Sequence, residues 1–343
     1  MIKLLRTFNG GPGLNASPLA HDGRSALIVT ADLIETRNVE TGEPVASYPA
    51  VRARLFPGPK DGLIVSIYTK GSTRIKDLIS GKTICDICGE PITMIRMSAD
   101  RSCLGIGRSR FTGFDGEYYS SYTAEFWNLA EDVAYWFKEG SGDSGGALTD
   151  MEVSDDGRFA AVTSFASLFP ISLKDGRTIG KWRTSARSPG DLVFTRDSRF
   201  LLVNNRHAID IIDLASQQIR QFAAPPAGKS FNSLAVSPDE AQVLAGGEGW
   251  FGLWEFGSGR LIWERQFAFG HVQLGWFLAE SGFIAVTPVF GKIEVISNKD
   301  GAAIDSIKAH VRPVTAVAET SGGRHFLTTD AREIKVWELS DAV

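Results

Sequence analysis

A serine between small residues, in the segment Gly-Asp-Ser-Gly-Gly at 142–146, could act as a nucleophile. Such a serine needs a histidine to take its proton and an acid to orient that histidine. In one common chain order both partners precede the serine, but His21 is the only histidine before Ser144. Small residues also suit a connection between strands, because glycine tolerates the unusual dihedrals of tight loops. We therefore interpret this segment as a loop.

A second segment, residues 247–252, matches the pattern Gly-x-Gly-x-x-Gly of dinucleotide-binding loops. That chemistry requires a helix directly after the loop, so that the helix N-terminus faces the pyrophosphate. The residues that follow, Leu-Trp-Glu-Phe, are typical of a strand instead. The pattern is predicted to be a turn between two strands.

The cysteines and histidines do not show the spacing of a metal site. Cys85 and Cys88 lack the second ligand pair that zinc needs, and a spacing of three puts the two sulfurs on opposite faces of a strand. We interpret this pair as packing residues, with a redox role as the alternative. His271 and His310 lie 39 residues apart, which indicates one repeated structural position. We predict no catalytic residue, no metal and no cofactor.

The composition is that of an ordinary soluble globular protein. The 343 residues are 43 % hydrophobic and 22 % charged, and a formal net charge of −4 gives no reason to expect nucleic-acid binding. No stretch approaches the roughly 20 apolar residues of a membrane span. Three cysteines argue against a disulfide framework. We expect a cytoplasmic protein with neither nucleic acid nor membrane as a partner.

A repeat runs through the whole chain and sets the positions of these residues. Short turn-like segments recur around aspartates, in steps of 39, 39, 56, 41 and 42 residues. An apolar, β-prone run follows each turn, and a second such run follows after it. Units of about 40 residues with four short strands are typical of β-propeller blades. The repeated aspartates are Asp22, Asp61, Asp100, Asp156, Asp197 and Asp239.

The last unit carries the clearest signature, with His310, Thr328, Asp330 and Trp337 at regular spacing. On these residues the chain resembles the WD-repeat family, and the resemblance covers essentially all of the chain. It implies that a histidine, a serine or threonine, an aspartate and a tryptophan form a hydrogen-bonded brace inside the blade. The other units carry only parts of this set, such as Trp254.

We count eight units, of which the eighth stops at Val343 after its third strand. Residues 5–8 resemble the outer-strand segments 219–222 and 264–267, so the N-terminal strand is predicted to complete the last blade. That pairing would leave no unpaired gap in the ring. The predicted fold is all-β, a single β-propeller domain over residues 1–343 with eight four-stranded blades. Seven blades with one irregular unit is the alternative.

The 56-residue step comes from an insertion in the third blade, residues 109–123. Aromatic and arginine side chains dominate interface hot spots, because they bury a large area at modest entropic cost. We therefore predict that this loop insertion binds a partner, and an extended hairpin that packs on the propeller is the alternative. The candidate contact residues here are Arg108, Arg110, Phe114, Tyr118 and Tyr119.

Connections from second to third strands, and from outer to next inner strands, share one face of a propeller. Four more candidate contact residues are assigned to this face, namely Arg52, Arg206, Trp250 and Arg312. The arginines would make it more basic than the net charge suggests, so an acidic protein or peptide segment fits by charge complementarity. A scatter of solvated charges is the alternative.

We expect a non-catalytic scaffold, a monomeric propeller within a larger assembly that presents this face to a protein or peptide. The alternative is a small-ligand-binding or enzymatic propeller that uses the mouth of the central channel. That class usually supplies acids or histidines that converge on the channel, and the spacing shows no such cluster. The preference for a scaffold depends mainly on that absence, since fold alone does not decide function.

Overall fold

The computed structural model is built from strands, and the residues that it describes contain no helix. In that part of the chain there is accordingly no helix that could cross a bilayer. The described residues are 2–339 except for 11–18, 20–22, 31–32, 50–52, 57–63, 70–71, 78–81, 89–91, 99, 101, 115–116, 130, 132, 143–147, 165–166, 185–190, 268–274, 279–281, 288–290 and 331.

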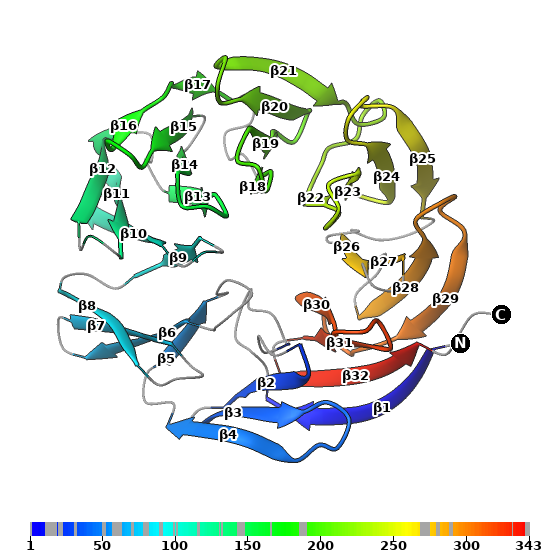
Figure 1. Ribbon diagram of the computed structural model, residues 1–343. Helices are drawn as coiled ribbons and strands as arrows, with labels where there is room; N and C mark the ends of the chain where they lie inside the picture. Colours follow the sequence, from blue (N-terminus) through cyan, green and yellow to red (C-terminus); the bar gives the residue numbers. More distant parts are fainter. Residues whose placement is uncertain are drawn as a thin grey trace.

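Within these residues the strands form eight antiparallel sheets, which follow one another around a common centre (Figure 1). The first strand of each sheet lies nearest to the centre and the last lies on the perimeter. This arrangement is propeller-like, as the repeat predicted. Sheet 1 contains β2 (Ser25–Val29), β3 (Leu33–Asn38) and β4 (Pro44–Pro49); sheet 2 contains β5 (Ala53–Phe56), β6 (Ile64–Thr69), β7 (Ser72–Asp77) and β8 (Thr83–Cys88); sheet 3 contains β9 (Met94–Met97), β10 (Cys103–Phe114), β11 (Glu117–Asn128) and β12 (Val133–Gly142).

The remaining sheets follow the same order. Sheet 4 contains β13 (Leu148–Val153), β14 (Phe159–Ser164), β15 (Ser167–Ser172) and two short pieces that both pair with β15, β16 (Arg177–Thr178) and β17 (Trp182–Arg183). Sheet 5 contains β18 (Leu192–Phe194), β19 (Phe200–Asn204), β20 (Ile209–Asp213) and β21 (Gln218–Ala223); sheet 6 contains β22 (Ser233–Val236), β23 (Gln242–Gly247), β24 (Trp250–Glu255) and β25 (Leu261–Gln266). Sheet 7 contains β26 (Gly275–Leu278), β27 (Phe283–Val286), β28 (Lys292–Ser297) and β29 (Ala303–Lys308); sheet 8 contains β30 (Ala316–Glu319), β31 (His325–Thr329), β32 (Glu333–Leu339) and β1 (Ile2–Asn9).

The repeated aspartates shape the turns between first and second strands. In sheet 5, Thr195 Oγ1 donates to Asp197 Oδ1 at 2.6 Å and accepts the amide of Phe200 at 3.0 Å. Ser237 and Asp239 repeat this geometry in sheet 6, with a hydroxyl–carboxylate distance of 2.6 Å. These hydroxyl bonds, together with backbone bonds, hold the pKa of Asp197 and of Asp239 below its usual value. The repeat in the sequence is therefore a repeat of turn chemistry.

Apolar clusters join neighbouring sheets around the ring. Sheets 3 and 4, for example, share a core that includes Phe126 and Met151, and sheets 5 and 6 share one that includes Phe231 and Trp254. A further cluster joins sheet 8 to sheet 1, with Leu327 among its members. The last and first sheets are thus packed on each other by the same means as the others.

The N-terminal strand completes sheet 8, as predicted. β1 pairs with β32 from Ile2–Leu339 to Asn9–Glu333, and the register skips one residue between Leu4 and Arg6. A skip of one residue is a β-bulge, which bends a strand and increases its twist. β1 therefore has the local shape of an ordinary outer strand. The same one-residue skip occurs in β4, β8, β25 and β29, at Val45, Ile84, Ile262 and Ile304.

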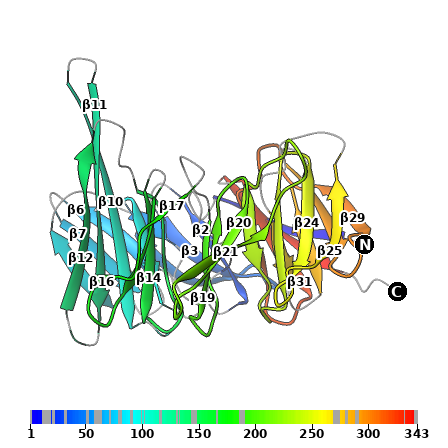
Figure 2. The same ribbon diagram turned by 90° about the horizontal axis from the view of Figure 1, so that it is seen from above.

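The insertion at 109–123 continues the two middle strands of sheet 3. β10 and β11 stay paired from Cys103–Asn128 to Phe114–Glu117, and this hairpin projects beyond the other sheets (Figure 2). The insertion is thus a paired hairpin, and whether its aromatic side chains bind a partner or pack on the propeller stays a prediction, because those of Phe114, Tyr118 and Tyr119 lie outside the described residues. β12 runs alongside it as far as Gly142, which pairs with Ser120. The first residue of the serine-containing segment, Gly142, therefore belongs to a strand.

Candidate interaction face

Backbone hydrogen bonds tie the predicted face together. The amide of Phe231 donates to Arg206 O at 2.7 Å, and the amide of His310 donates to Gly291 O at 2.9 Å. Each bond joins an outer-to-inner connection to a turn between second and third strands. We call this end of the sheets the connection face, formed by residues 205–208, 224–232, 248–249, 309–315 and 332.

Exposed cations gather on the connection face. Arg206 and Arg312 are exposed, as predicted, and so are Lys229 and Arg332. The backbone of Arg206 adopts a φ of 57°, and its amide donates to Asn204 Oδ1 at 3.0 Å, so the arginine sits on a fixed turn. Next to Arg312, Val311 is 87 % exposed. Glu248 is an exposed acid on the same face, and Lys229 Nζ donates to its carbonyl oxygen at 3.1 Å.

Trp250 does not lie on this face, contrary to the prediction. Its side chain is 1 % exposed, and its ring centroid lies 5.3 Å from that of Phe231 and 6.2 Å from that of Trp254. The first residue of β24 faces the core between sheets 5 and 6, where a large aromatic ring fills the available space. Burial of this area stabilises the fold, so the indole is a core residue.

Arg108 is a second correction. It is 8 % exposed and forms an ion pair with Glu125, which is 1 % exposed. Arg108 lies on β10 and Glu125 on β11, below the projecting end of the hairpin. A buried carboxylate requires a compensating cation, so this arginine is engaged inside sheet 3.

Some of the residues singled out in the sequence fall outside the part of the chain that the structure describes. Arg52 and Ser144 lie outside the described residues, as does His271. The backbone of the hairpin is described, but the side chains at four predicted contacts lie outside the described part, namely those of Arg110, Phe114, Tyr118 and Tyr119.

The glycine-rich segment is a turn, as predicted. Gly247 ends β23, Gly249 has a φ of 72°, and β24 begins at Trp250. No helix follows, so the segment offers no helix N-terminus to a phosphate. Cys85 is half-buried on β8, and Cys103 is buried.

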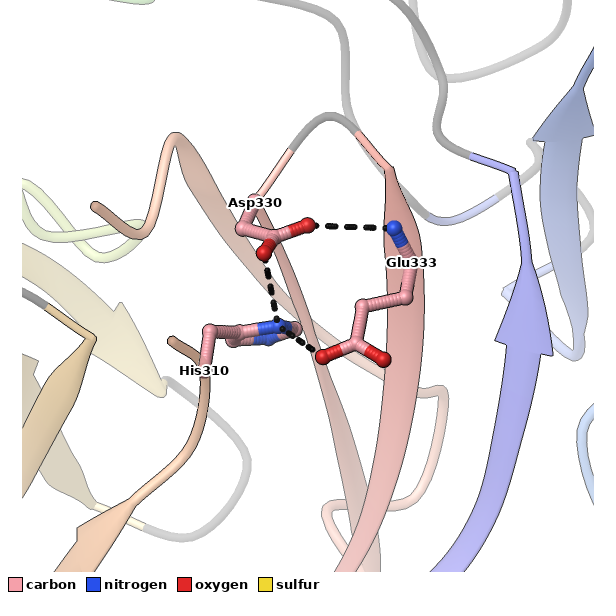
Figure 3. A group of neighbouring side chains, drawn as sticks. All are labelled: His310, Asp330 and Glu333. Carbon is pink, nitrogen blue, oxygen red and sulfur yellow. Dashed lines mark hydrogen bonds and ion pairs between the residues drawn. The ribbon is translucent and has the colours of Figure 1, made fainter. Parts of the chain in front are cut away.

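Three of the four residues of the implied brace, His310, Thr328 and Trp337, are hydrogen-bonded in sheet 8, whereas the hydrogen-bond partner of His310 Nδ1 is Glu333 rather than Asp330. Thr328 Oγ1 lies 2.7 Å from His310 Nε2 and accepts a hydrogen bond from Trp337 Nε1 at 2.9 Å. His310 Nδ1 faces carboxylates, with Glu333 Oε1 at 3.1 Å and Asp330 Oδ2 at 3.8 Å (Figure 3). Carboxylates only accept, so Nδ1 carries the proton and Thr328 donates to Nε2. Burial lowers the pKa of His310, which favours this neutral form.

His310, Asp330 and Glu333 are, among the described residues, the group whose ligand atoms could surround a metal ion. Each of them already has protein partners. Asp330 Oδ1 accepts the amides of Arg332 and Glu333 at 3.0 and 3.1 Å. Lys335 Nζ lies 3.0 Å from Glu333 Oε1, where its charge opposes that of a divalent cation. The arrangement works as an internal brace.

The inner strands bring together a charged cluster that the sequence analysis missed. Arg96 on β9 lies 3.1 Å from Asp150 and 3.1 Å from Glu152, both on β13. Asp191, directly before β18, is a third carboxyl that interacts electrostatically with the guanidinium of Arg96. Burial is the largest influence on the carboxyls, and it raises the pKa of Glu152 to about 7 and that of Asp191 to about 6. The pKa of Asp150 is raised as well, again chiefly by burial.

Two of these carboxyls also connect neighbouring sheets. Asp150 Oδ2 accepts the amide of Leu192 in sheet 5 at 3.2 Å, and Asp191 Oδ2 accepts the amide of Leu234 in sheet 6 at 2.9 Å. Each bond crosses from one inner strand to the next. The equivalence of the two aspartates within the repeat was the signal that could have found them. We therefore assign these acids a role in joining the sheets near the centre.

The comparisons with known proteins show the fold and nothing more specific. No protein-family model and no curated protein matches this chain. Among solved structures, it is similar to one described as the crystal structure of the computationally designed Ika8 protein. The TM-score is 0.73 over 98 % of each chain, at 13 % sequence identity. This likeness supports an all-β repeat architecture along the full length.

Proposed function

We propose that this chain is a closed eight-bladed propeller of the WD-repeat type, which acts as a non-catalytic scaffold and binds an acidic segment of a partner protein on its connection face. The observation that carries this proposal is that the reactive polar groups are bonded inside the protein, whereas two arginines are exposed. Groups capable of chemistry, such as His310 and Glu152, are engaged in internal bonds. Arg206 and Arg312 are exposed and form no ion pair with any described residue.

Charge and geometry both favour an acidic partner. The turn that carries Arg206 is held by backbone hydrogen bonds, so the backbone from which the guanidinium projects is fixed. Pre-organised groups lose less freedom on binding than groups on mobile loops. Arg312 stands next to the exposed Val311, which adds an apolar contact beside the charge. Electrostatic complementarity of this kind raises association rates and selects partners by charge.

Binding of a fluorescein-labelled acidic peptide, followed by anisotropy at low and moderate salt, tests this proposal. The double variant Arg206→Glu/Arg312→Glu is expected to bind about tenfold more weakly, a loss of about 1.4 kcal/mol. The matched control is Arg220→Glu, a charge reversal at an exposed arginine on β21 away from the connection face. Equal binding by the double variant and the control would overturn the proposal.

A second function is favoured by one observation, the cluster of Arg96, Asp150, Glu152 and Asp191 on the inner strands. Acids with raised pKa values near the centre of a ring are typical of ligand-binding or catalytic sites. A small cationic ligand at the channel mouth would then be the partner. Binding that is lost in Glu152→Gln and kept in Arg206→Glu/Arg312→Glu would support this function over the scaffold.

A further inference from the structure

A cavity of about 260 Å³ opens at the junction of sheets 8 and 1, at the end of the sheets opposite the connection face. Its walls come from the turn between β30 and β31 and from the segments on either side of β2 and β3. The side chains that matter for its chemistry are Arg24, Asn38, Glu40, Ser321, Arg324 and His325. We call it the junction cavity.

Hydrogen-bond donors dominate the junction cavity. Arg24, Ser321 and Arg324 are exposed residues at its rim, and Arg324 is ion-paired with Glu338. His325 is 7 % exposed, and no hydrogen bond joins its imidazole to any described residue. His325 contributes to the wall of the cavity from the first position of β31.

The walls of the cavity are held in place across the two sheets. The amide of Ser321 donates to Gly23 O at 3.0 Å, and the amide of Val39 donates to Arg24 O at 2.8 Å. The turn at Asn38 is closed by its own side chain, which accepts the amide of Glu40 at 2.9 Å. Arg6 of β1 donates from Nε to Glu40 O at 3.0 Å. The cavity is thus built on a fixed backbone, as ligand sites usually are.

Two acids limit which ligand can bind. Glu338 accepts from Arg324 at 3.0 Å, and Glu40 forms part of the wall. A ligand with a single negative charge gains little binding free energy here, because these carboxylates repel it. A phosphate group carries more charge and several acceptor oxygens, which suit the bidentate geometry of arginine. The volume accommodates such a group with a small organic remainder.

We propose that the junction cavity binds the phosphate group of a small molecule, or free phosphate, between Arg24 and Arg324. Because the walls belong to sheet 8 and to sheet 1, the bound anion holds the two sheets together. A ligand that binds only the folded ring stabilises it in proportion to its concentration. Phosphate binding would then act on the place where the last and first sheets meet.

Thermal unfolding of the full chain in inorganic phosphate, in glycerol 3-phosphate and in chloride of equal ionic strength tests this proposal. A rise in Tm in either phosphate compound over chloride is expected, and the compound that gives it identifies the source. The rise should disappear in Arg24→Gln. It should persist in the control Arg260→Gln, an exposed arginine on a turn of sheet 6.

Glu40→Gln gives the opposite test, because loss of a wall carboxylate should tighten phosphate binding several-fold. Titration calorimetry with phosphate at low temperature measures this directly and does not depend on how a variant unfolds. No Tm rise in either compound, or an unchanged affinity in Arg24→Gln, would overturn the proposal.

Discussion

The brace in sheet 8 and the inner-strand cluster in sheets 3 to 5 both bury polar side chains, and they do so in different ways. In the brace, Thr328 joins His310 and Trp337 through neutral hydrogen bonds, and each group has a partner. In the cluster, one guanidinium faces an excess of carboxyls, and burial raises the pKa of Glu152 to about 7. The brace is a satisfied network, whereas the cluster changes its charge in the neutral range.

This difference predicts how the two regions respond to pH and to mutation. A fully bonded neutral network loses stability when one member is removed, and the loss is similar across neutral pH. A cluster with excess carboxyls is stabilised by protons, because its folded-state pKa values lie above those of the unfolded chain. The contribution of the brace to stability is therefore nearly independent of pH in the neutral range, whereas the contribution of the cluster changes with pH.

Thr328→Val is expected to give the largest effect. It leaves His310 Nε2 and Trp337 Nε1 without a partner in a site where Thr328 itself is 0 % exposed. Two unsatisfied buried groups predict a loss of about 3 kcal/mol in unfolding free energy. Urea denaturation at pH 7.5 measures it, and Thr328→Ser, which keeps the hydroxyl, should recover most of the loss. A loss as large in the serine variant would show that packing, not the hydroxyl, holds the brace.

Arg96→Met should come next, with a loss of about 2 kcal/mol at pH 8. This is less than for a fully buried pair, since the Arg96 side chain remains 26 % exposed. The loss should shrink at pH 5, which lies below the pKa of Glu152, about 7, and that of Asp191, about 6, because these two carboxyls then no longer need the charge of Arg96. Arg199→Met, which removes an arginine from an exposed ion pair with Asp213, is the control. Equal losses at both pH values would contradict the titrating character of the cluster.

Glu152→Gln should give the smallest effect, and one of opposite sign. The pKa of Glu152 is raised from 4.5 to about 7, so its contribution to stability is complete below pH 4.5 and lost as pH rises to about 7. Glutamine stays neutral, and the variant is expected to be about 1 kcal/mol more stable than wild type at pH 8. Chemical denaturation from pH 5 to 8 checks this, with Glu264→Gln on the exposed side of β25 as a control expected to change little.

The sequence predicted the architecture well, because the repeat is encoded locally. Asp197 and Asp239 sit in turns whose side-chain hydrogen bonds join residues at most five positions apart, so their spacing is visible in the chain. The brace was also predictable, since its residues lie within one unit. Arg96 and Asp150 meet only because the ring places neighbouring inner strands side by side, and 54 residues separate them. The direction of individual side chains was also not predictable from the sequence. Trp250 and Arg108 are aromatic and cationic, as interface residues often are, but both point into the protein.

The pairing of β1 with β32 determines how late in synthesis β1 can find its partner strand. β1 is synthesised more than 300 residues before the strand it pairs with. Until β32 leaves the ribosome, β1 has no partner edge, and the side chain of Phe8, which is buried in the folded protein, stays uncovered. Contacts between such distant segments form slowly, because a long loop must close first. A cell that makes this protein must therefore keep an unpaired strand from meeting other chains for nearly the whole of translation.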